Sequence, residues 1–463
     1  MTSNLEHTLG RHAVVVGGSM AGLMSAAVLA EYFDRVTVFE RDRIEDRPVL
    51  HKSVPQGNHI HALLLGGQNV MASLYPGFTE ELVRLGAVRF RTGIDIAFYG
   101  PHGKGYNATR SVTEPRDLGL EGHIMSRGLL EYHVRRRTAA ITNVKLEADA
   151  PIEGFIRDDR RIRGVRRKHP AAGVESVEAD LVVDASGRSS HASRWLLEMD
   201  VPAPEETIIG VDFAYTSTKY RKPDLVDSPE PLLLVGGPPP EHTRAAGLFE
   251  IEDRTWHVSL AGRFGDYPPT DEAGFLAFAK ALPSTRLYDL IKDAERIADI
   301  THHRFPTSVW RHYERLRTFP AGLLILGDAI CSFNPVYGQG MSSAALQVQA
   351  LQRILREHAE QSRGLDGLAA AFFPKAAQAV SAPWTLAANF DFAYPQTRGE
   401  RPPGLAEGAG YFAALDSLQA EDLNVQRLVT EVFQLVKPIS ALREEPLLSR
   451  ILTRLQEQKQ RRT

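Results

Sequence analysis

The sequence predicts an α/β fold in which a parallel sheet carries an antiparallel insertion and is followed by a helical C-terminal region. An apolar run at 12–17 enters a glycine turn, helical composition follows at 21–32, and a second apolar run at 35–40 completes a βαβ unit. Between 205 and 315, short runs separated by turn residues are typical of antiparallel strands. Beyond residue 360 the composition is mostly helical.

Composition narrows the class of protein. The chain has 463 residues, enough for two or three units with large cores, and a net charge of −3 that gives no bulk attraction to nucleic acid. The arginine-dense stretch at 157–168 is interrupted by Asp and Gly and is interpreted as a solvated β-hairpin. The only cysteine, Cys331, excludes an intramolecular disulfide and favours a reducing, cytoplasmic location. We expect no metal site, because His59 and His61 lack a recognisable third ligand.

The chain ends carry weaker signals. The N-terminus has no apolar core typical of a signal peptide, and no apolar run of about 18 residues predicts a transmembrane helix. The last stretch, 446–463, is amphipathic and ends basic, and we expect it to pack on the body or on another subunit. The sequence gives no indication of the oligomeric state.

The motif VVVGGSMAGL at 14–23 has the pattern of a pyrophosphate-binding turn. Gly17 allows a sharp exit from the strand, Gly22 lets the helix pack closely, and the helix N-terminus favours a negative group. The usual central glycine is replaced by Ser19, and Gly18 lies one residue early, which predicts a slightly shifted backbone approach to the phosphate. The predicted turn residues are Gly17, Gly18, Ser19, Met20, Ala21 and Gly22.

Glu40 ends the second strand, 23 residues after Gly17. An acid at this place can accept hydrogen bonds from ribose hydroxyls and favours a free 2′-hydroxyl over a 2′-phosphate. The pattern predicts a dinucleotide site, and by itself it does not separate FAD from NAD.

The string AGLLILGDAICSFNPVYGQGM at 321–341 favours a flavin. It is predicted as a buried strand, then Gly-Asp, then an Asn-Pro loop, then a glycine-rich helix start. Asp328 is an acceptor suited to a ribityl hydroxyl, and Pro335 stiffens the loop. Gly338 and Gly340 let backbone approach a flat ring, and the helix N-terminus would stabilise charge on the reduced flavin.

Together these motifs resemble the para-hydroxybenzoate-hydroxylase-type FAD-dependent monooxygenases, most closely the branch of squalene epoxidase and the polyether polyene epoxidases. The resemblance runs over roughly residues 12–400 and rests on VVVGGSMAGL, VFERD, VPQGNHIHALLLGG, SRGLLEYHVR, VVDASGR and LGDAICSFNPVYGQGM. It implies that Glu40 and Arg41 hold the ADP half of FAD, that Arg127 reaches the cofactor from a helix start, and that Gln56 belongs to the same site. Pro335, Gly338, Gly340 and Met341 would then surround the isoalloxazine ring.

The resemblance also implies a domain division. A Rossmann-like FAD-binding domain of the glutathione-reductase type would comprise 1–85, 120–200 and 316–360. An antiparallel substrate-binding sheet would comprise 86–119 and 201–315, and a helical region 361–463.

The implied function is oxygen transfer from a flavin C4a-hydroperoxide to a bulky, largely apolar substrate of secondary-metabolite type, with O₂ as co-substrate. Epoxidation of an alkene needs no protein base, whereas hydroxylation of a phenol benefits from one. No catalytic side chain is assigned; His59, His61 and Tyr337 are the candidates by motif context.

Two departures from the family pattern leave alternatives open. Asp184-Ala185 stands where aromatic hydroxylases usually carry Asp-Gly, so the flavin could be reduced by NAD(P)H directly or through a separate flavin reductase. The W-x-W-x-I-P signature of flavin halogenases is absent. An FAD-dependent reductase of the geranylgeranyl-reductase type is the main rival function, and a halogenase or a non-catalytic flavin-binding module are lesser ones.

Overall fold

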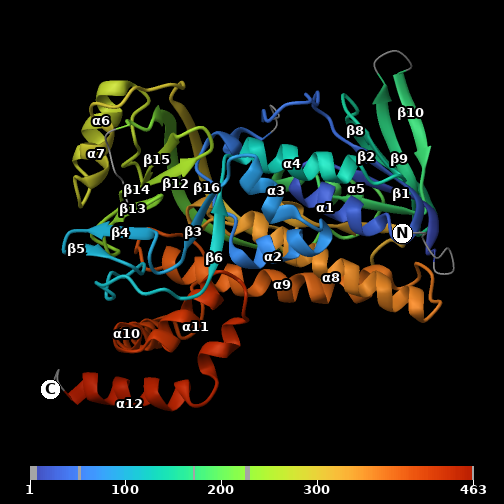
Figure 1. Cartoon of the computed structure of the whole chain (residues 1–463). Helices are drawn as coiled ribbons and strands as arrows, with labels where there is room; N and C mark the ends of the chain where they lie inside the picture. Colours follow the sequence, from blue (N-terminus) through green and yellow to red (C-terminus); the bar gives the residue numbers. More distant parts are fainter. Residues whose placement is uncertain (1–7, 51–53, 170–172, 225–229, 461–463) are drawn as a thin grey trace.

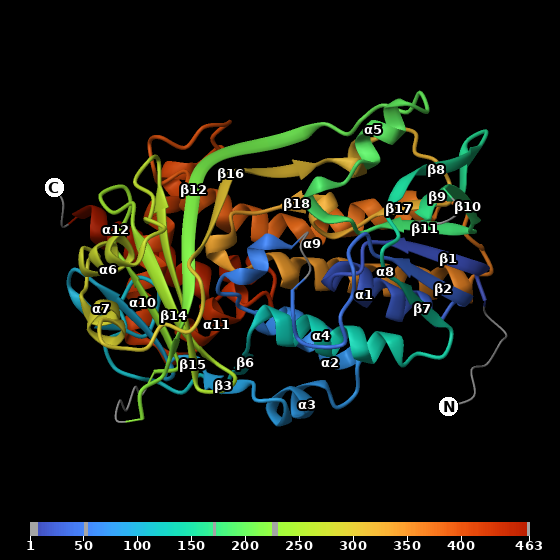
Figure 2. The same ribbon diagram turned by 90° about the horizontal axis from the view of Figure 1, so that it is seen from above.

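The computed structural model describes residues 8–50, 54–169, 173–224 and 230–460. The molecule is elongated, with a parallel sheet towards one end, a large antiparallel sheet towards the other, and the helices of residues 405–460 beneath the second (Figure 1). Seen from above, the long strands β12 (Glu206–Arg221) and β16 (Thr301–Arg311) connect the two ends (Figure 2). The basic end of the last segment, 461–463, and most of the N-terminal segment, 1–7, lie outside the described residues.

The parallel sheet has the strand order β17-β11-β1-β2-β7. Its strands are β1 (Gly10–Val16), β2 (Phe33–Phe39), β7 (Val144–Glu147), β11 (Leu181–Asp184) and β17 (Leu323–Ile325). Their apolar side chains are buried on both faces, which agrees with the continuous apolar runs in the sequence. Helices α1 (Met20–Leu29), α4 (Arg127–Ala139) and α8 (Gly340–Glu360) pack together on it, so the predicted βαβ unit is confirmed.

Several smaller elements accompany the two sheets. The arginine-dense stretch forms the predicted hairpin, β8 (Ile152–Asp158) with β9 (Arg161–His169), joined by β10 (Gly173–Glu178) as a third strand. The remaining small elements are α2 (Leu65–Leu74), α3 (Phe78–Arg84), α5 (Ala192–Leu197) and the two-stranded sheet of β3 (Val88–Arg91) and β6 (Glu121–Ile124).

The second sheet has eight strands in the order β18-β16-β12-β15-β14-β13-β4-β5. They are β4 (Ile96–Gly100), β5 (Gly103–Gly105), β12 (Glu206–Arg221), β13 (Leu232–Gly236), β14 (Ala245–Ile251), β15 (Thr255–Arg263), β16 (Thr301–Arg311) and β18 (Cys331–Ser332). All neighbours are antiparallel except β13 and β4, which pair in parallel. Helices α6 (Glu272–Lys280), which the sequence predicts, and α7 (Arg286–Ile291), which it does not, cover one end. The domain boundaries stay a prediction.

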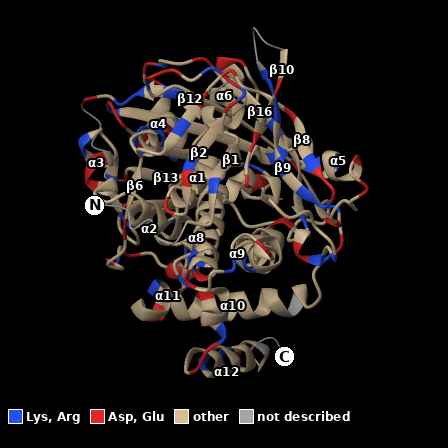
Figure 3. Cartoon of the chain, turned by 90° about the vertical axis from the view of Figure 1, so that its right-hand side faces the viewer, with Lys and Arg blue, Asp and Glu red and all other residues tan. Residues whose placement is uncertain are grey.

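The C-terminal helices are α9 (Leu368–Asp391), α10 (Leu405–Glu421), α11 (Leu423–Phe433) and α12 (Leu447–Gln460). The last three share a small apolar core of their own, in which Ala414 and Ile451 are fully buried. Viewed from the side, α10 and α11 lie below α8 and α9, and α12 lies below them (Figure 3). Within the described residues, every helix is too short or too polar to cross a membrane.

Candidate active site

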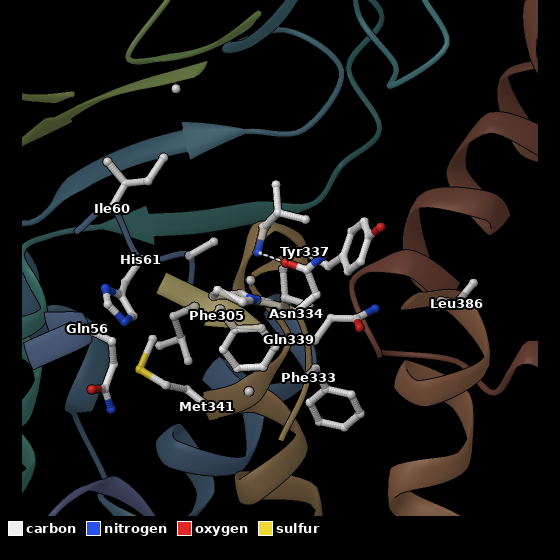
Figure 4. Close-up of a pocket in the computed structure, with 18 of the residues that line it drawn as sticks. Gln56, Ile60, His61, Phe305, Phe333, Asn334, Tyr337, Gln339, Met341 and Leu386 are labelled. Carbon is white, nitrogen blue, oxygen red and sulfur yellow. Dashed lines mark hydrogen bonds between the residues drawn. The ribbon is translucent and has the colours of Figure 1, made fainter. Parts of the chain in front are cut away.

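A cavity of about 1570 Å³ runs between the two sheets. At one end it is lined by the turn after β1 and by the segment that follows β17. At the other end it is lined by strands of the second sheet and by α9, α10 and α11. The glycine turn at 14–23 and the 321–341 segment, about 300 residues apart in sequence, therefore line the same cavity. Figure 4 shows the later segment facing residues 56–61 across this space.

Backbone geometry at the first turn requires glycine. Gly17 has φ +105°, and a Cβ there would lie 2.6 Å from the carbonyl oxygen of Ala185. A Cβ on Gly22 would lie 1.8 Å from the carbonyl oxygen of Gly17, so only glycine lets α1 start this close to β1. Ser19, Met20 and Ala21 consequently line the cavity at the N-terminus of α1.

Gly18 is not among the residues that line the cavity, and its contact with the cofactor stays a prediction. Its N–H donates to Glu40 Oε2 at 2.7 Å, and a Cβ there would lie 2.9 Å from Glu40 Cβ. A side chain at position 18 would therefore collide with the Glu40 side chain, so this position requires glycine. Glu40 Oε1 accepts from the N–H of Asp42 at 2.9 Å, and the buried carboxylate and Arg41 both line the cavity. The contact of Glu40 with ribose stays a prediction.

A buried ionic cluster lies beside this turn. Ser126 caps α4 by accepting from the N–H of Leu129 at 3.1 Å, so the helix begins at Arg127. Arg127 Nη2 donates to Glu131 Oε2 at 2.6 Å and to Ser19 Oγ at 2.9 Å. Arg127 Nη1 is buried and has no hydrogen-bond partner in the described part of the chain. An unmet cationic donor beside a helix N-terminus suits a pyrophosphate.

The segment after β17 supplies an acid and an open backbone. The strand ends at Ile325, and Gly327 then turns the chain with φ +72°. Asp328 lines the cavity; burial raises its pKa to about 6, against the opposing charges of Arg188 and Arg127. A Cβ on Gly340, the first residue of α8, would meet within 4 Å only Asp328 Oδ1, at 3.9 Å. The backbone therefore faces free space at this point.

The Asn-Pro loop closes this end of the cavity. Asn334 Oδ1 accepts from the N–H of Val336 at 3.2 Å, which shapes the turn at Pro335 (Figure 4). Gly338 has φ +65° and its hypothetical Cβ would lie 3.1 Å from Ala62 Cβ, on the segment opposite. The loop residues Pro335 and Gly338 line the cavity, as does Met341 in the first turn of α8. The opposite residues Gln56 and His61 line it as well.

The three candidate bases differ in their environments. His59 is buried outside the cavity lining, 2.7 Å from Ser217 Oγ, and burial lowers its pKa to about 2. Tyr337 lines the cavity but donates its hydroxyl to Asp391 at 2.7 Å, which keeps the proton on the phenol. His61 lines the cavity, and its Nδ1–H donates to the carbonyl oxygen of His59 at 2.9 Å.

His61 therefore carries its remaining lone pair on Nε2. Burial, and next the charge of Arg127, lower its pKa to about 4, so the ring is neutral at pH 7. Of the three candidates, it is the one that combines a place on the cavity with a free acceptor atom. Among the described residues, no group of three His, Cys, Asp or Glu side chains could hold a metal ion. Cys331 is buried, and burial raises the pKa of its thiol.

Sequence reasoning missed several cavity residues. Arg188 lies 4.3 Å from the ring of Phe305 and donates from Nη2 to Thr307 Oγ1 at 2.9 Å. Arg188 lies in the turn after a buried strand, next to Asp184-Ala185. This position could have indicated from the sequence that it belongs to the site. His303 also lines the cavity, but an isolated histidine in a strand gives no signal in a single sequence.

The far part of the cavity is an apolar chamber. Its walls come from both strands and C-terminal helices, which no local motif marks. The apolar residues include Phe90, Ile96, Phe98, Leu232, Leu234, Phe249, Leu386, Phe390, Phe412, Leu415, Val429 and Phe433. At its rim Asp416 Oδ1 accepts from Ser111 Oγ at 2.8 Å and from Asn107 Nδ2 at 3.2 Å, which ties α10 to the loop after β5.

Comparison with known proteins identifies the family. No protein-family model matches the chain. Protein Rv3254 of Mycobacterium tuberculosis is 31% identical over 405 residues, covering 86% of this chain and 84% of that protein. Squalene epoxidase 1 of Arabidopsis thaliana is 23% identical, covering 76% of this chain and 60% of that enzyme. Kynurenine 3-monooxygenase of Salinispora arenicola is 27% identical, covering 78% and 76%. The chain belongs to the family of Protein Rv3254, among the FAD-dependent monooxygenases of the para-hydroxybenzoate-hydroxylase type.

Solved structures share the fold of this monooxygenase. The flavin-dependent brominase Bmp2 superposes with a TM-score of 0.67 at 15% identity, covering 98% of this chain and 100% of that one. PqsL, described as a probable FAD-dependent monooxygenase from Pseudomonas aeruginosa, gives 0.58 at 19% identity, covering 83% and 97%. At these identities the likeness shows the fold alone, and it confirms the predicted fold class. The squalene-epoxidase-like branch stays a prediction.

The lining of the cavity fits FAD, the cofactor of this family. The unmet donor of Arg127 suits the pyrophosphate, Asp328 is an acceptor for hydroxyl groups, and the backbone at Gly340 is open to a flat ring. The individual contacts stay predictions.

Proposed function

We propose that this monooxygenase inserts one oxygen atom of O₂ into a bulky, largely apolar organic substrate, by epoxidation of an alkene or hydroxylation of an activated ring. One observation carries the proposal: the same cavity is lined by ionic and backbone groups at its nucleotide end and by apolar side chains at its far end. The names of the relatives, squalene epoxidase and kynurenine 3-monooxygenase, support the reaction class.

The chain's residues would hold FAD along the first part of the cavity. The set is Gly17, Ser19, Met20, Ala21, Glu40, Arg41, Gln56, Arg127, Asp328, Pro335, Gly338, Gly340 and Met341. Bound and reduced, FAD supplies the chemistry that activates O₂ for transfer to the substrate. The N-terminus of α8 presents the positive end of a helix dipole, and the buried Arg127 presents an Nη1 donor that has no partner among the described residues. Each favours a negative group nearby.

The apolar chamber has two tasks. It orients a large substrate by burying its apolar surface, and it excludes water from the reacting groups. Helices α10 and α11 form one wall through Phe412, Val429 and Phe433, and α9 contributes Leu386 and Phe390. Alkene epoxidation needs no protein base; for a phenolic substrate, neutral His61 is the side chain we assign to accept the hydroxyl proton at Nε2.

The supply of electrons is a separate part of the proposal. Asp184 is fully buried and accepts from Ser186 Oγ at 2.5 Å and Ser190 Oγ at 2.6 Å, so it serves the turn in which Ala185 replaces the usual glycine. We propose that a separate flavin reductase reduces the cofactor. Adding free reductase and NADH should then raise activity severalfold, whereas substrate-stimulated NAD(P)H oxidation by the pure protein would contradict it.

The deciding experiment supplies ¹⁸O₂ to the holoenzyme with NADH and a free flavin reductase. Polyene, terpenoid and phenolic substrates are screened, and products are analysed by mass spectrometry. One labelled oxygen atom per product supports the proposal. Turnover that is independent of O₂ and saturates a double bond would instead establish a reductase of the geranylgeranyl-reductase type. Products containing bromide or chloride, when these ions are added, would establish a halogenase.

A further inference from the structure

One buried carboxylate ties the Asn-Pro loop to two distant parts of the chain. Asp391, the last residue of α9, is fully buried. Its Oδ1 accepts from Asn334 Nδ2 at 2.9 Å, from Tyr337 OH at 2.7 Å and from Arg263 Nη1 at 2.9 Å. Asn334 and Tyr337 belong to the loop, and Arg263 belongs to β15. A loop, a strand and a helix thus meet at a single oxygen atom.

Arg263, the cationic partner of Asp391, is also held in place by its neighbours. Arg263 is buried, and its guanidinium lies 5.3 Å from the ring centre of Phe213 and 4.8 Å from that of Tyr394. Its Nη2 also donates to Tyr337 OH at 3.2 Å. Burial raises the pKa of Asp391, and Arg263 opposes this by favouring the ionised form. Because a buried ion is costly when its partner is lost, neither group can move independently.

The same junction borders the substrate chamber. Phe390, beside Asp391, stacks on Tyr337 with ring centres 5.6 Å apart and lies 6.0 Å from the ring of Phe433 on α11. Tyr337, Phe390 and Phe433 line the cavity, whereas the Asp391 carboxylate lies behind them. The carboxylate therefore acts on the cavity only through the loop and the aromatic rings.

We propose that Asp391 is a positioning residue that holds the loop of residues 334–338 in the conformation that receives FAD. Asn334 uses its amide to bind Asp391 and its carbonyl oxygen to accept from the N–H of Val336, so fixing one side chain fixes the turn. A loop that is ordered before binding spares FAD the entropic cost of ordering it. The inference concerns cofactor binding alone, so it stands apart from the reaction proposed above.

The test measures FAD binding to the FAD-free full-length protein by fluorescence titration. Asp391→Asn keeps the shape but removes the charge that Arg263 and the loop share. We expect its Kd for FAD to rise about tenfold, the effect of losing a charged buried hydrogen-bond network, and the visible absorption bands of the bound flavin to shift. Tyr337→Phe, which removes one donor and leaves the Arg263–Asp391 pair, should raise Kd about threefold.

The two substitutions should be non-additive when combined, since they act through the same atom. The matched control is Asp266→Asn, which breaks the Arg244–Asp266 pair at 2.6 Å, an ion pair outside the cavity lining. It should lower the Tm of the FAD-free protein and leave the FAD Kd unchanged.

The inference is overturned if Asp391→Asn lowers the Tm as the control does while the FAD Kd and the flavin spectrum stay as in the wild type. It is also overturned if the control weakens FAD equally. Should Asp391→Asn fail to fold, Tyr337→Phe decides, because an unchanged Kd in that variant contradicts a role of this network in FAD binding. A wild-type protein that binds FAD but inserts no oxygen atom would contradict only the proposed function.

Discussion

At its nucleotide end, the cavity is built from short consecutive segments: a glycine turn, a strand-terminal acid, a helix start and the loop after β17. At its far end, the walls come from single side chains on strands and helices as distant as Phe90 and Phe433. The first end is held by buried charges and by backbone contacts that tolerate only glycine. The second is held by apolar packing. Substitutions at the first end should therefore affect cofactor binding, and substitutions at the second should affect the choice of substrate.

The largest effect is expected at the backbone of the glycine turn. Gly22→Ala would place a Cβ 1.8 Å from the carbonyl oxygen of Gly17, so strand and helix must separate. We expect a destabilisation of about 3 kcal/mol and loss of bound FAD, measured by denaturant unfolding and by absorbance of the purified protein. Gly410→Ala in α10 is the control, since its Cβ would meet Leu455 at an ordinary 3.5 Å. Normal stability of the Gly22 variant would contradict the close approach of α1 to β1.

The next effect concerns the acid after β17. Asp328→Asn should raise the Kd for FAD about tenfold without unfolding the protein, because a neutral amide accepts less strongly than a carboxylate. In the wild type the FAD-free protein has the pKa of Asp328 raised to about 6. FAD affinity should therefore fall as the pH drops through 6, and the variant should lack this dependence. A wild-type affinity that is flat between pH 7 and 5 would count against Asp328.

Stability of the FAD-free protein should depend on pH in the opposite direction. Since folding raises the pKa of Asp328 from 3.8 to about 6, the folded state binds the proton more tightly than the unfolded chain. The contribution of this group is fully favourable below about pH 4 and is lost as the pH rises through 6. Denaturant titrations of wild type and Asp328→Asn at pH 5 and 7 measure the difference, which should favour the variant at pH 7.

This contrast also explains what the sequence could predict. The βαβ unit, the hairpin, the second sheet and most cavity residues of the first end follow from local patterns, because backbone turns and helix starts need particular residues at fixed spacings. The contact of Gly18 could not be predicted, since its neighbour Glu40 is 22 residues away and only the fold brings them together. The chamber and the Asp391 junction depend on side chains from three or more elements, and single residues such as Arg263 carry no local signal.

At the chamber end, a substitution should change selectivity and leave the cofactor in place. Phe412→Ala on α10 removes a ring from the wall and enlarges the apolar chamber. We expect the ratio of kcat/KM for long over short substrates to rise about tenfold. The FAD Kd should stay within twofold of the wild type. Leu452→Ala, on the exposed side of α12, is the control and should change neither quantity. A fall in FAD affinity in the Phe412 variant would contradict the assignment of cofactor binding to the nucleotide end alone.

The smallest effect is expected where the glycine fingerprint departs from its usual form. Ser19 Oγ donates to Glu131 Oε2 at 2.7 Å and accepts from Arg127 Nη2 at 2.9 Å, so the serine links α1 to the buried ion pair. Ser19→Ala removes both bonds, and Ser19→Gly removes them and restores the usual glycine. Each should weaken FAD binding about two- to tenfold, the effect of losing one or two buried hydrogen bonds, as measured by fluorescence titration. If Ser19→Gly instead bound FAD more tightly than the wild type, backbone approach at this position would outweigh the side-chain link, and the nucleotide end would be less dependent on its ionic cluster than the hydrogen bonds indicate.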